Sequence, residues 1–143
     1  MSLSELLQRE PDGETLQLWL QKAPYAAYLG IRAEVHGNEL LFVLPQDEKC
    51  IGNPTLPALH GGVTGALLEC AAIATVIAEV DTAELPKIVN LAIDYLRPGR
   101  PLDTFARGRI TRQGRRVVNV QVQAWQQRPE VPIATASAHF LIA

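Results

Sequence analysis

Residues 59–80 read LHGGVTGALLECAAIATVIAEV, and this stretch decides the fold of the chain. Two adjacent glycines, Gly61 and Gly62, precede a long segment whose only charged residues are Glu69 and Glu79. A helix that is apolar on every side belongs in a protein core. We therefore predict one long central helix with Glu69 buried inside it, where a carboxylate is costly unless it is paired or used.

The glycine pair marks the start of this helix. The first N–H groups of a helix have no acceptor within it, so the Gly61 N–H can hold the oxygen of a polarised thioester carbonyl. Glu69 can attack such a carbonyl or deprotonate a water molecule. Eight residues separate Gly61 from Glu69, about 12 Å along one helix, so no single carbonyl carbon can lie within about 3 Å of both. If both groups act on one substrate, they come from two subunits, most simply in a twofold dimer.

The rest of the chain predicts an antiparallel sheet. An amphipathic helix at residues 14–22 ends near Pro24, and strands at 30–36 and 39–44 form a hairpin around a Gly-Asn turn. Residues 45–59 are expected to form a loop. Four strands follow Pro86, at residues 89–95, 102–111, 118–125 and 134–142, with Val89, Leu91, Ile93 and Tyr95 sharing one face. The pattern predicts an α+β domain in which a helix packs on one face of the sheet.

Composition narrows the class of protein. The 143 residues fit a single domain, 1–143, with residues 1–24 as an N-terminal helical extension. A hydrophobic content of 48% with 20% charged residues is typical of a globular protein, and a net charge of −2 without a basic run argues against nucleic acid. We expect no membrane segment and a cytoplasmic protein. Cys50 and Cys70 lack metal-type spacing, so no metal site is expected.

Several motifs together carry a family resemblance. Asn53-Pro54, His60-Gly61-Gly62, Leu67-Leu68-Glu69 and the later segment 94–98, DYLRP, resemble the hotdog-fold acyl-CoA thioesterases related to the phenylacetate-pathway enzyme. The resemblance runs from Tyr25 to the end, and residues 112–115, RQGR, are similar to a further strand-turn feature. It implies a hotdog fold, with the sheet wrapped around the central helix. It also implies hydrolysis of an acyl-CoA to acid and CoA by a homodimer or homotetramer, without a cofactor beyond the CoA of the substrate.

The same resemblance implies a role for each motif residue. Gly61 supplies the oxyanion N–H, and Glu69 of the partner subunit is the nucleophile or general base. His60 fixes the loop and the carbonyl-binding geometry, and Asn53 assists the carbonyl. The candidate substrate contacts are Gly62, Arg97 and Arg115, the two arginines being suited to CoA phosphates.

Two positions depart from the family pattern. Asn53 lies seven residues before His60, one more than the family spacing. Ile88 lies seven residues before Tyr95, where many relatives carry a Ser or Thr that positions water. Two other functions therefore stay open: an enoyl-thioester hydratase or dehydratase that uses His60 and Glu69, and a non-catalytic acyl-CoA or lipid-binding module. Release of free thiol from a saturated acyl-CoA separates the thioesterase from both.

Overall fold

A computed structural model describes residues 13–80 and 84–142 of the chain, so the first half of the predicted N-terminal extension, residues 1–12, lies outside it. The helices are α2 (Gly13–Lys22), α3 (Pro24–Leu29), α4 (Gly61–Glu79) and the short 3-10 helix η1 (Glu48–Cys50). The strands are β1 (Arg32–His36), β2 (Glu39–Leu44), β3 (Ile51–Asn53), β4 (Ala58–Leu59), β5 (Lys87–Tyr95), β6 (Thr104–Gln113), β7 (Val117–Trp125) and β8 (Ala134–Leu141).

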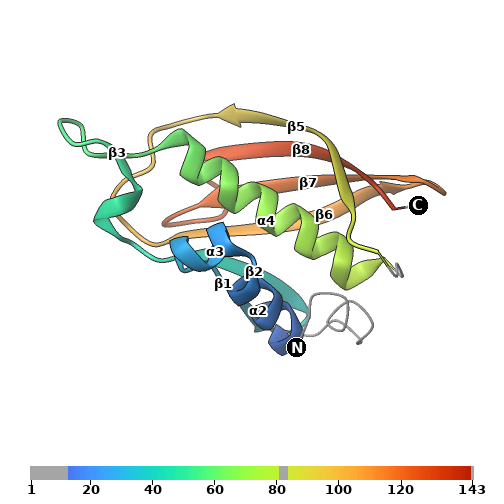
Figure 1. The fold of residues 1–143 in the computed structure, drawn as a ribbon. Coiled ribbons are helices and arrows are strands. Elements are labelled where there is room, and N and C mark those ends of the chain that lie inside the picture. Colours follow the sequence, from blue (N-terminus) through green and yellow to red (C-terminus); the bar gives the residue numbers. More distant parts are fainter. Residues whose placement is uncertain (1–12, 81–83, 143) are drawn as a thin grey trace.

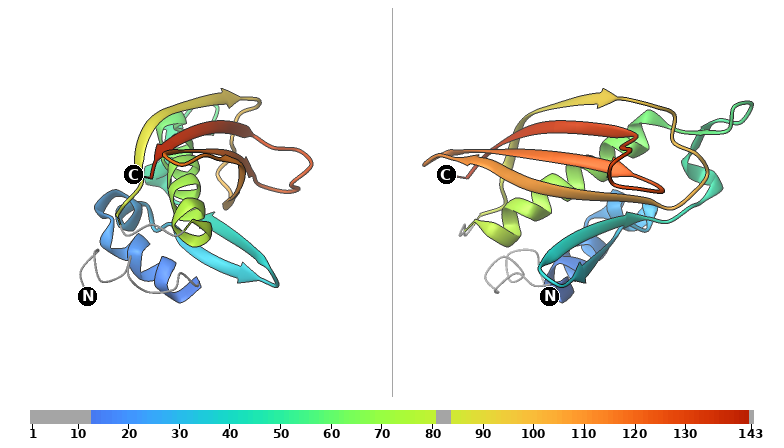
Figure 2. Two further views of the ribbon diagram at one scale, coloured as in Figure 1. Left: turned by 90° about the vertical axis from the view of Figure 1, so that its right-hand side faces the viewer. Right: turned by 180° about the vertical axis from the view of Figure 1, so that it is seen from behind.

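Six of the strands form one antiparallel sheet in the order β1-β2-β6-β7-β8-β5. The sheet curves around α4, which lies along its concave side (Figures 1 and 2). The inward side chains of β7 and β8 are buried against this helix. The predicted α+β hotdog fold, with an antiparallel sheet around one long apolar helix, is confirmed.

The helix is not enclosed on every side, and the prediction that Glu69 is buried is wrong for the described chain. Leu67 and Leu68 are fully buried, whereas the Glu69 side chain is exposed. A curved sheet covers one side of a helix and leaves a stripe uncovered, here formed by Gly62, Ala66, Glu69, Cys70 and Ile73. By length and composition alone α4 could cross a bilayer, but 56% of its most apolar window is buried inside the fold.

The segments before α4 hold more structure than their sequence predicts. Helix α2 matches the predicted helix, but a second short helix, α3, begins at once because Pro24 is well suited to the first helical turn. Residues 45–59, predicted as a loop, contain η1 and the small hairpin β3–β4. This hairpin leads directly into Gly61, so it determines how the chain enters α4.

Strand β5 lies at one edge of the sheet, and no described strand pairs with its outer side. Its predicted alternation holds for Leu91, Ile93 and Tyr95, which oppose the inward alanines of β8. Val89 departs from it, because a bulge between Ile88 and Asn90 adds one residue to β5. Several large apolar side chains of this edge and the following turn are more than 40% exposed: Ile88, Val89, Tyr95 and Leu96.

Candidate active site

The start of α4 presents one free backbone donor. His60 is the N-cap residue in an extended conformation, and its Nδ1 atom accepts the Gly62 N–H at 2.9 Å. The N–H of His60 donates to the Cys50 carbonyl at 2.9 Å, which links the helix start to the end of η1. Among the described residues the Gly61 N–H has no acceptor. His60 therefore satisfies the neighbouring amide and leaves that of Gly61 available, as the oxyanion prediction requires.

Tyr95 holds the same helical turn from the sheet. Its hydroxyl donates to the Gly61 carbonyl at 2.7 Å, across 34 residues of sequence. A Cβ atom placed on Gly61 would lie 3.5 Å from the Tyr95 ring, which is ordinary van der Waals contact. The Tyr95 ring thus lies against the turn that carries the free amide.

A hollow of about 380 Å³ opens beside Gly61. Its walls come from the start of α4, the segment that follows β5, and the end of the β7–β8 connection. The lining includes Leu59, Gly61, Thr64, Tyr95, Arg97 and Ile133. A small, largely apolar cavity beside a free backbone donor is a suitable place for the carbonyl end of a thioester.

Asn53 lies at the end of β3, in the hairpin that precedes the helix. Its Oδ1 atom accepts the N–H groups of Thr55 and Leu56, at 3.1 and 3.3 Å, so the side chain closes an Asx-type turn. A β-bulge adds one residue to β3 between Ile51 and Asn53. That extra residue matches the one-residue shift in the spacing from Asn53 to His60. The Nδ2 group of Asn53 donates to no described residue and is free to assist a carbonyl.

Glu69 projects from the uncovered stripe of α4, about 12 Å along the axis from Gly61 by helix geometry. Cys70 is its neighbour and carries the only thiol on the helix. Burial raises the pKa of the Cys70 thiol to about 12, and the Glu69 charge adds to this shift. Because the thiolate is the reactive form, the raised pKa makes Cys70 a weak nucleophile at neutral pH and favours Glu69 as the candidate. Among residues 13–80 and 84–142, no group of three His, Cys, Asp or Glu side chains is arranged to hold a metal ion.

The two predicted phosphate contacts lie at opposite ends of the sheet. Arg97 lines the hollow beside Gly61 and donates a hydrogen bond to the Pro132 carbonyl. Arg115 lies in the β6–β7 turn, which leads into Val117 at the start of β7. Val117 pairs with Leu141 of β8, and Leu141 pairs on its other side with Lys87 of β5. This is the end of β5 remote from Tyr95. Within one chain, Gly61 and Arg97 line the same hollow, His60 and Gly62 flank Gly61, and Asn53 lies in the hairpin that precedes them. Glu69 and Arg115 lie apart from this group.

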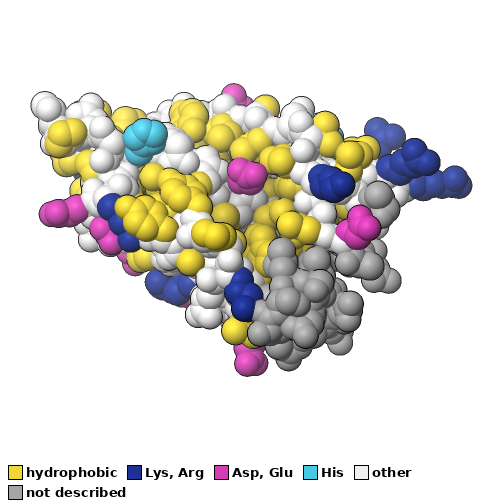
Figure 3. All heavy atoms as spheres, viewed as in Figure 1, with side chains coloured by type: hydrophobic (Ala, Val, Ile, Leu, Met, Phe, Trp, Pro, Cys, Tyr) yellow, Lys and Arg dark blue, Asp and Glu magenta, His cyan; other side chains and the backbone are white. Residues whose placement is uncertain are grey.

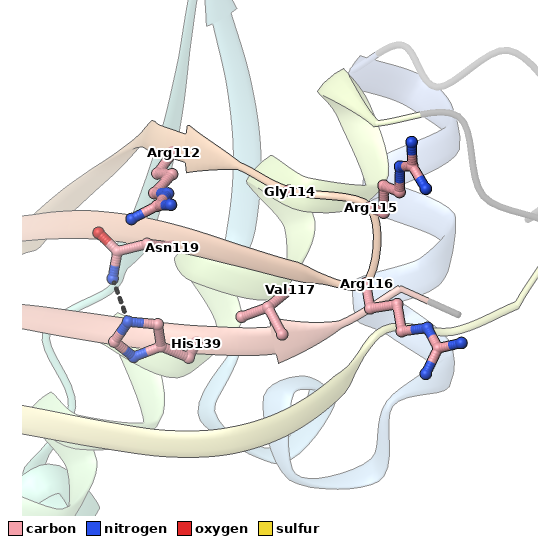
Figure 4. Close-up of a pocket in the computed structure, with 7 residues that line it drawn as sticks. All are labelled: Arg112, Gly114, Arg115, Arg116, Val117, Asn119 and His139. Atoms are coloured by element: carbon pink, nitrogen blue, oxygen red, sulfur yellow. Dashed lines mark hydrogen bonds between the residues drawn. The ribbon is translucent and has the colours of Figure 1, made fainter.

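The β6–β7 turn forms a basic site of its own. A hollow of about 470 Å³ is lined by Arg112, Arg115, Arg116, Asn119 and His139, among others. Figure 4 shows Arg115 and Arg116 pointing away from the sheet and Arg112 beside Asn119. None of these arginines makes an ion pair in the described part of the chain. Seen from the side of α4, hydrophobic side chains cover much of the face, and basic side chains gather at the end that carries this turn (Figure 3).

Tyr95 is the site residue that the sequence does not assign. It belongs to the DYLRP segment, which supports the family resemblance but says nothing of a contact with Gly61. One sequence signal could have suggested this contact: in the alternation of β5, Tyr95 shares the inward face with Leu91 and Ile93.

Comparison with known proteins identifies the class of protein. The sequence model of the thioesterase superfamily matches residues 56–133, which include His60, Gly61, Glu69 and Tyr95. The chain therefore belongs to the thioesterase superfamily, and the resemblance noted in the sequence is confirmed at that level.

Individual relatives agree with this assignment. The medium/long-chain acyl-CoA thioesterase YigI of Escherichia coli is 24% identical over 88% of this chain and 90% of its own length. A crystal structure of a Chromobacterium violaceum protein is 37% identical, with a TM-score of 0.76 over 98% of this chain and 95% of that one. A phenylacetic acid degradation-related protein from Ralstonia eutropha is 24% identical, with a TM-score of 0.75 over 89% of this chain and 98% of that one.

Proposed function

We propose that this protein hydrolyses acyl-CoA thioesters, with each active site built from two subunits. The observation that carries the proposal is the free N–H of Gly61 at the start of α4, beside a hollow and on a helix that carries one exposed carboxylate two turns further on. The name of the YigI relative supports CoA thioesters with medium or long acyl chains as the substrate class.

The outer edge of β5 supports the second subunit. A long edge strand with exposed apolar side chains is prone to pair with another strand unless something covers it. Antiparallel pairing of two copies of β5 about a twofold axis would join two sheets and bring the uncovered stripes of two α4 helices toward each other. The homodimer accounts for the exposed edge and for the exposed stripe at once.

The packing of α4 against β5 indicates which register of that pairing would complete the site. A Cβ atom on Gly61 would touch Tyr95, and one on Gly65 would lie 3.1 Å from Ile93, so the two elements run in opposite directions. Four helix residues advance about 6 Å and two strand residues about 7 Å, so Glu69 lies level with Leu91 along the strand direction. A twofold axis that passes near Ile93 would place Leu91 of one subunit opposite Tyr95 of the other. Glu69 of the partner subunit then lies level with Gly61.

In the proposed reaction the thioester oxygen accepts the Gly61 N–H, which stabilises the negative charge that develops on it. Glu69 of the partner subunit either attacks the carbonyl carbon directly or removes a proton from the water that attacks. The C–S bond breaks, the sulfur leaves as the CoA thiolate and takes up a proton, and water supplies the oxygen of the product acid. The balance requires only the thioester and water.

Arg115 is proposed to contact the CoA phosphates of the site in the other subunit. The twofold axis places the Lys87 end of one β5, and with it the β6–β7 turn, at the same end of the dimer as Gly61 of the other subunit. The end of β6 and the turn carry three arginines that make no ion pair within the described residues, around a hollow that is large enough for part of a nucleotide.

Replacing Arg115 with alanine is expected to raise KM for an acyl-CoA about tenfold and to change kcat less than about twofold, since the contact is remote from the reacting carbonyl. KM for the matching acyl-pantetheine, which lacks the nucleotide, should not change. The control is Arg32→Ala, an exposed arginine on β1 at the opposite edge of the sheet. If KM rose equally for the acyl-CoA and the acyl-pantetheine, Arg115 would not be a contact of the nucleotide.

The function itself is tested with a panel of saturated acyl-CoAs of short, medium and long chain and with aromatic acyl-CoAs, by following the release of free thiol. We expect turnover, with the highest kcat/KM among the medium and long chains. Tight binding of the panel without thiol release would favour the binding module. Hydration of an enoyl-CoA without thiol release would favour the hydratase.

A further inference from the structure

We propose that Tyr95 is a positioning residue that holds the oxyanion-binding amide of Gly61 in place; the inference rests on the proposed function. The start of α4 needs such support because it contains two adjacent glycines, which restrict the backbone least. An oxyanion donor is effective only when its direction is set before the substrate arrives.

Two side chains hold the peptide unit between Gly61 and Gly62, one at its N–H and one at its carbonyl. His60 accepts the Gly62 N–H at 2.9 Å, and the Tyr95 hydroxyl donates to the Gly61 carbonyl at 2.7 Å. The Tyr95 side chain also packs against this turn. Its hydroxyl oxygen would lie 3.5 Å from a Cβ atom built on Gly61 and 3.6 Å from one built on Gly65. Both polar contacts, one from the cap and one from the sheet, therefore hold the Gly61–Gly62 peptide unit, which adjoins the free N–H across the Gly61 Cα atom.

The position of Tyr95 also links this turn to the proposed dimer. Tyr95 is the last residue of β5, the strand whose outer edge is proposed to meet the partner subunit. Its hydroxyl forms a direct hydrogen bond between that strand and the helix start. Pairing of β5 would fix the strand and, through the tyrosine, the direction of the Gly61 amide.

The test is Tyr95→Phe, which keeps the ring and removes only the hydroxyl. We expect kcat to fall about tenfold while KM changes less than about twofold, and the loss should be the same for acyl chains of different length. The matched control is Tyr28→Phe on α3, an exposed tyrosine whose hydroxyl bonds to no described residue. Incorporation of 3-fluorotyrosine at position 95, which keeps the hydroxyl, should restore kcat. A Tyr95→Phe variant that matches the Tyr28→Phe control in kcat would overturn the proposal.

NMR separates this inference from the proposed function, because it needs no turnover. In the unmodified protein the Gly61 carbonyl carbon should resonate downfield of that of Gly62, which has no side-chain donor among the described residues. The Gly61 amide resonance should shift or broaden in Tyr95→Phe. A Gly61 amide unchanged by Tyr95→Phe, or a carbonyl no different from that of Gly62 in the native protein, would refute the positioning role even if no thioester were hydrolysed.

Discussion

Replacing Glu69 with glutamine is expected to lower kcat for acyl-CoA hydrolysis by about 10³-fold or more, because the amide can neither attack the carbonyl nor accept a proton from water. The substitution keeps the shape of the side chain, and the Glu69 side chain is exposed in the described chain. Stability and assembly should therefore change little. Rates with a saturated acyl-CoA, together with the unfolding temperature and the molecular mass in solution, check both expectations.

The matched control is Glu79→Gln, an exposed acid near the end of the same helix. This variant changes the charge of the chain equally and should hydrolyse at the native rate. Turnover by Glu69→Gln within tenfold of the native kcat would show that another group performs the step assigned to this carboxylate.

Gly61→Pro should lower kcat by about 10²- to 10³-fold, because proline removes the one N–H that is assigned to the oxyanion. The first helical position tolerates proline well, and His60 already has the extended backbone, with φ −64° and ψ 129°, that a residue before proline adopts. The helix start should therefore survive the loss of its donor, which circular dichroism and kinetics with the same substrate can check.

Gly61→Ala distinguishes the missing N–H from the added atoms. Its Cβ would lie 3.5 Å from the Tyr95 ring, in ordinary contact, and the N–H remains. We expect Gly61→Ala to keep kcat within about fivefold of the native value. An alanine variant as inactive as the proline variant would mean that the glycine serves for space and that its amide is not the donor.

Periodicity made much of the fold predictable. The long helix, the hairpin before it and the four strands after it all follow from apolar residues that recur at helical or strand spacing. The same reading failed for Glu69, because an all-apolar helix does not reveal which side its own sheet leaves uncovered. The stripe around Glu69 consists of small or apolar residues such as Ala66, Cys70 and Ile73, which suit an interface as well as a core.

The candidate site was predictable only where its residues are neighbours in sequence. The free amide of Gly61 follows from the first turn of one helix, whereas for His60 the sequence predicted a role in fixing the loop and not the N-cap that it forms. The contact of Tyr95 with Gly61 joins residues 34 apart, and no local pattern reports it. The hairpin β3–β4 escaped prediction because strands of two or three residues between prolines and glycines show no alternation.

The geometry of His60 bears on the hydratase alternative. That reaction needs a histidine free to move a proton at carbon. Here the Nδ1 atom of His60 already accepts the Gly62 N–H, and its backbone is bound to Cys50. The residue is held as a cap, which favours hydrolysis with the acid as the active group.

The central claim is that each active site takes Gly61 from one subunit and Glu69 from the other, and mixing two inactive variants tests it most directly. The Glu69→Gln variant retains the Gly61 N–H, and the Gly61→Pro variant retains the Glu69 carboxylate. If the two are unfolded together and refolded, random pairing makes half of the dimers mixed, and each mixed dimer holds one intact site of two. Activity should then rise to about a quarter of the native value. A mixture that stays as inactive as its parents, although mass spectrometry shows mixed dimers, would contradict the shared site.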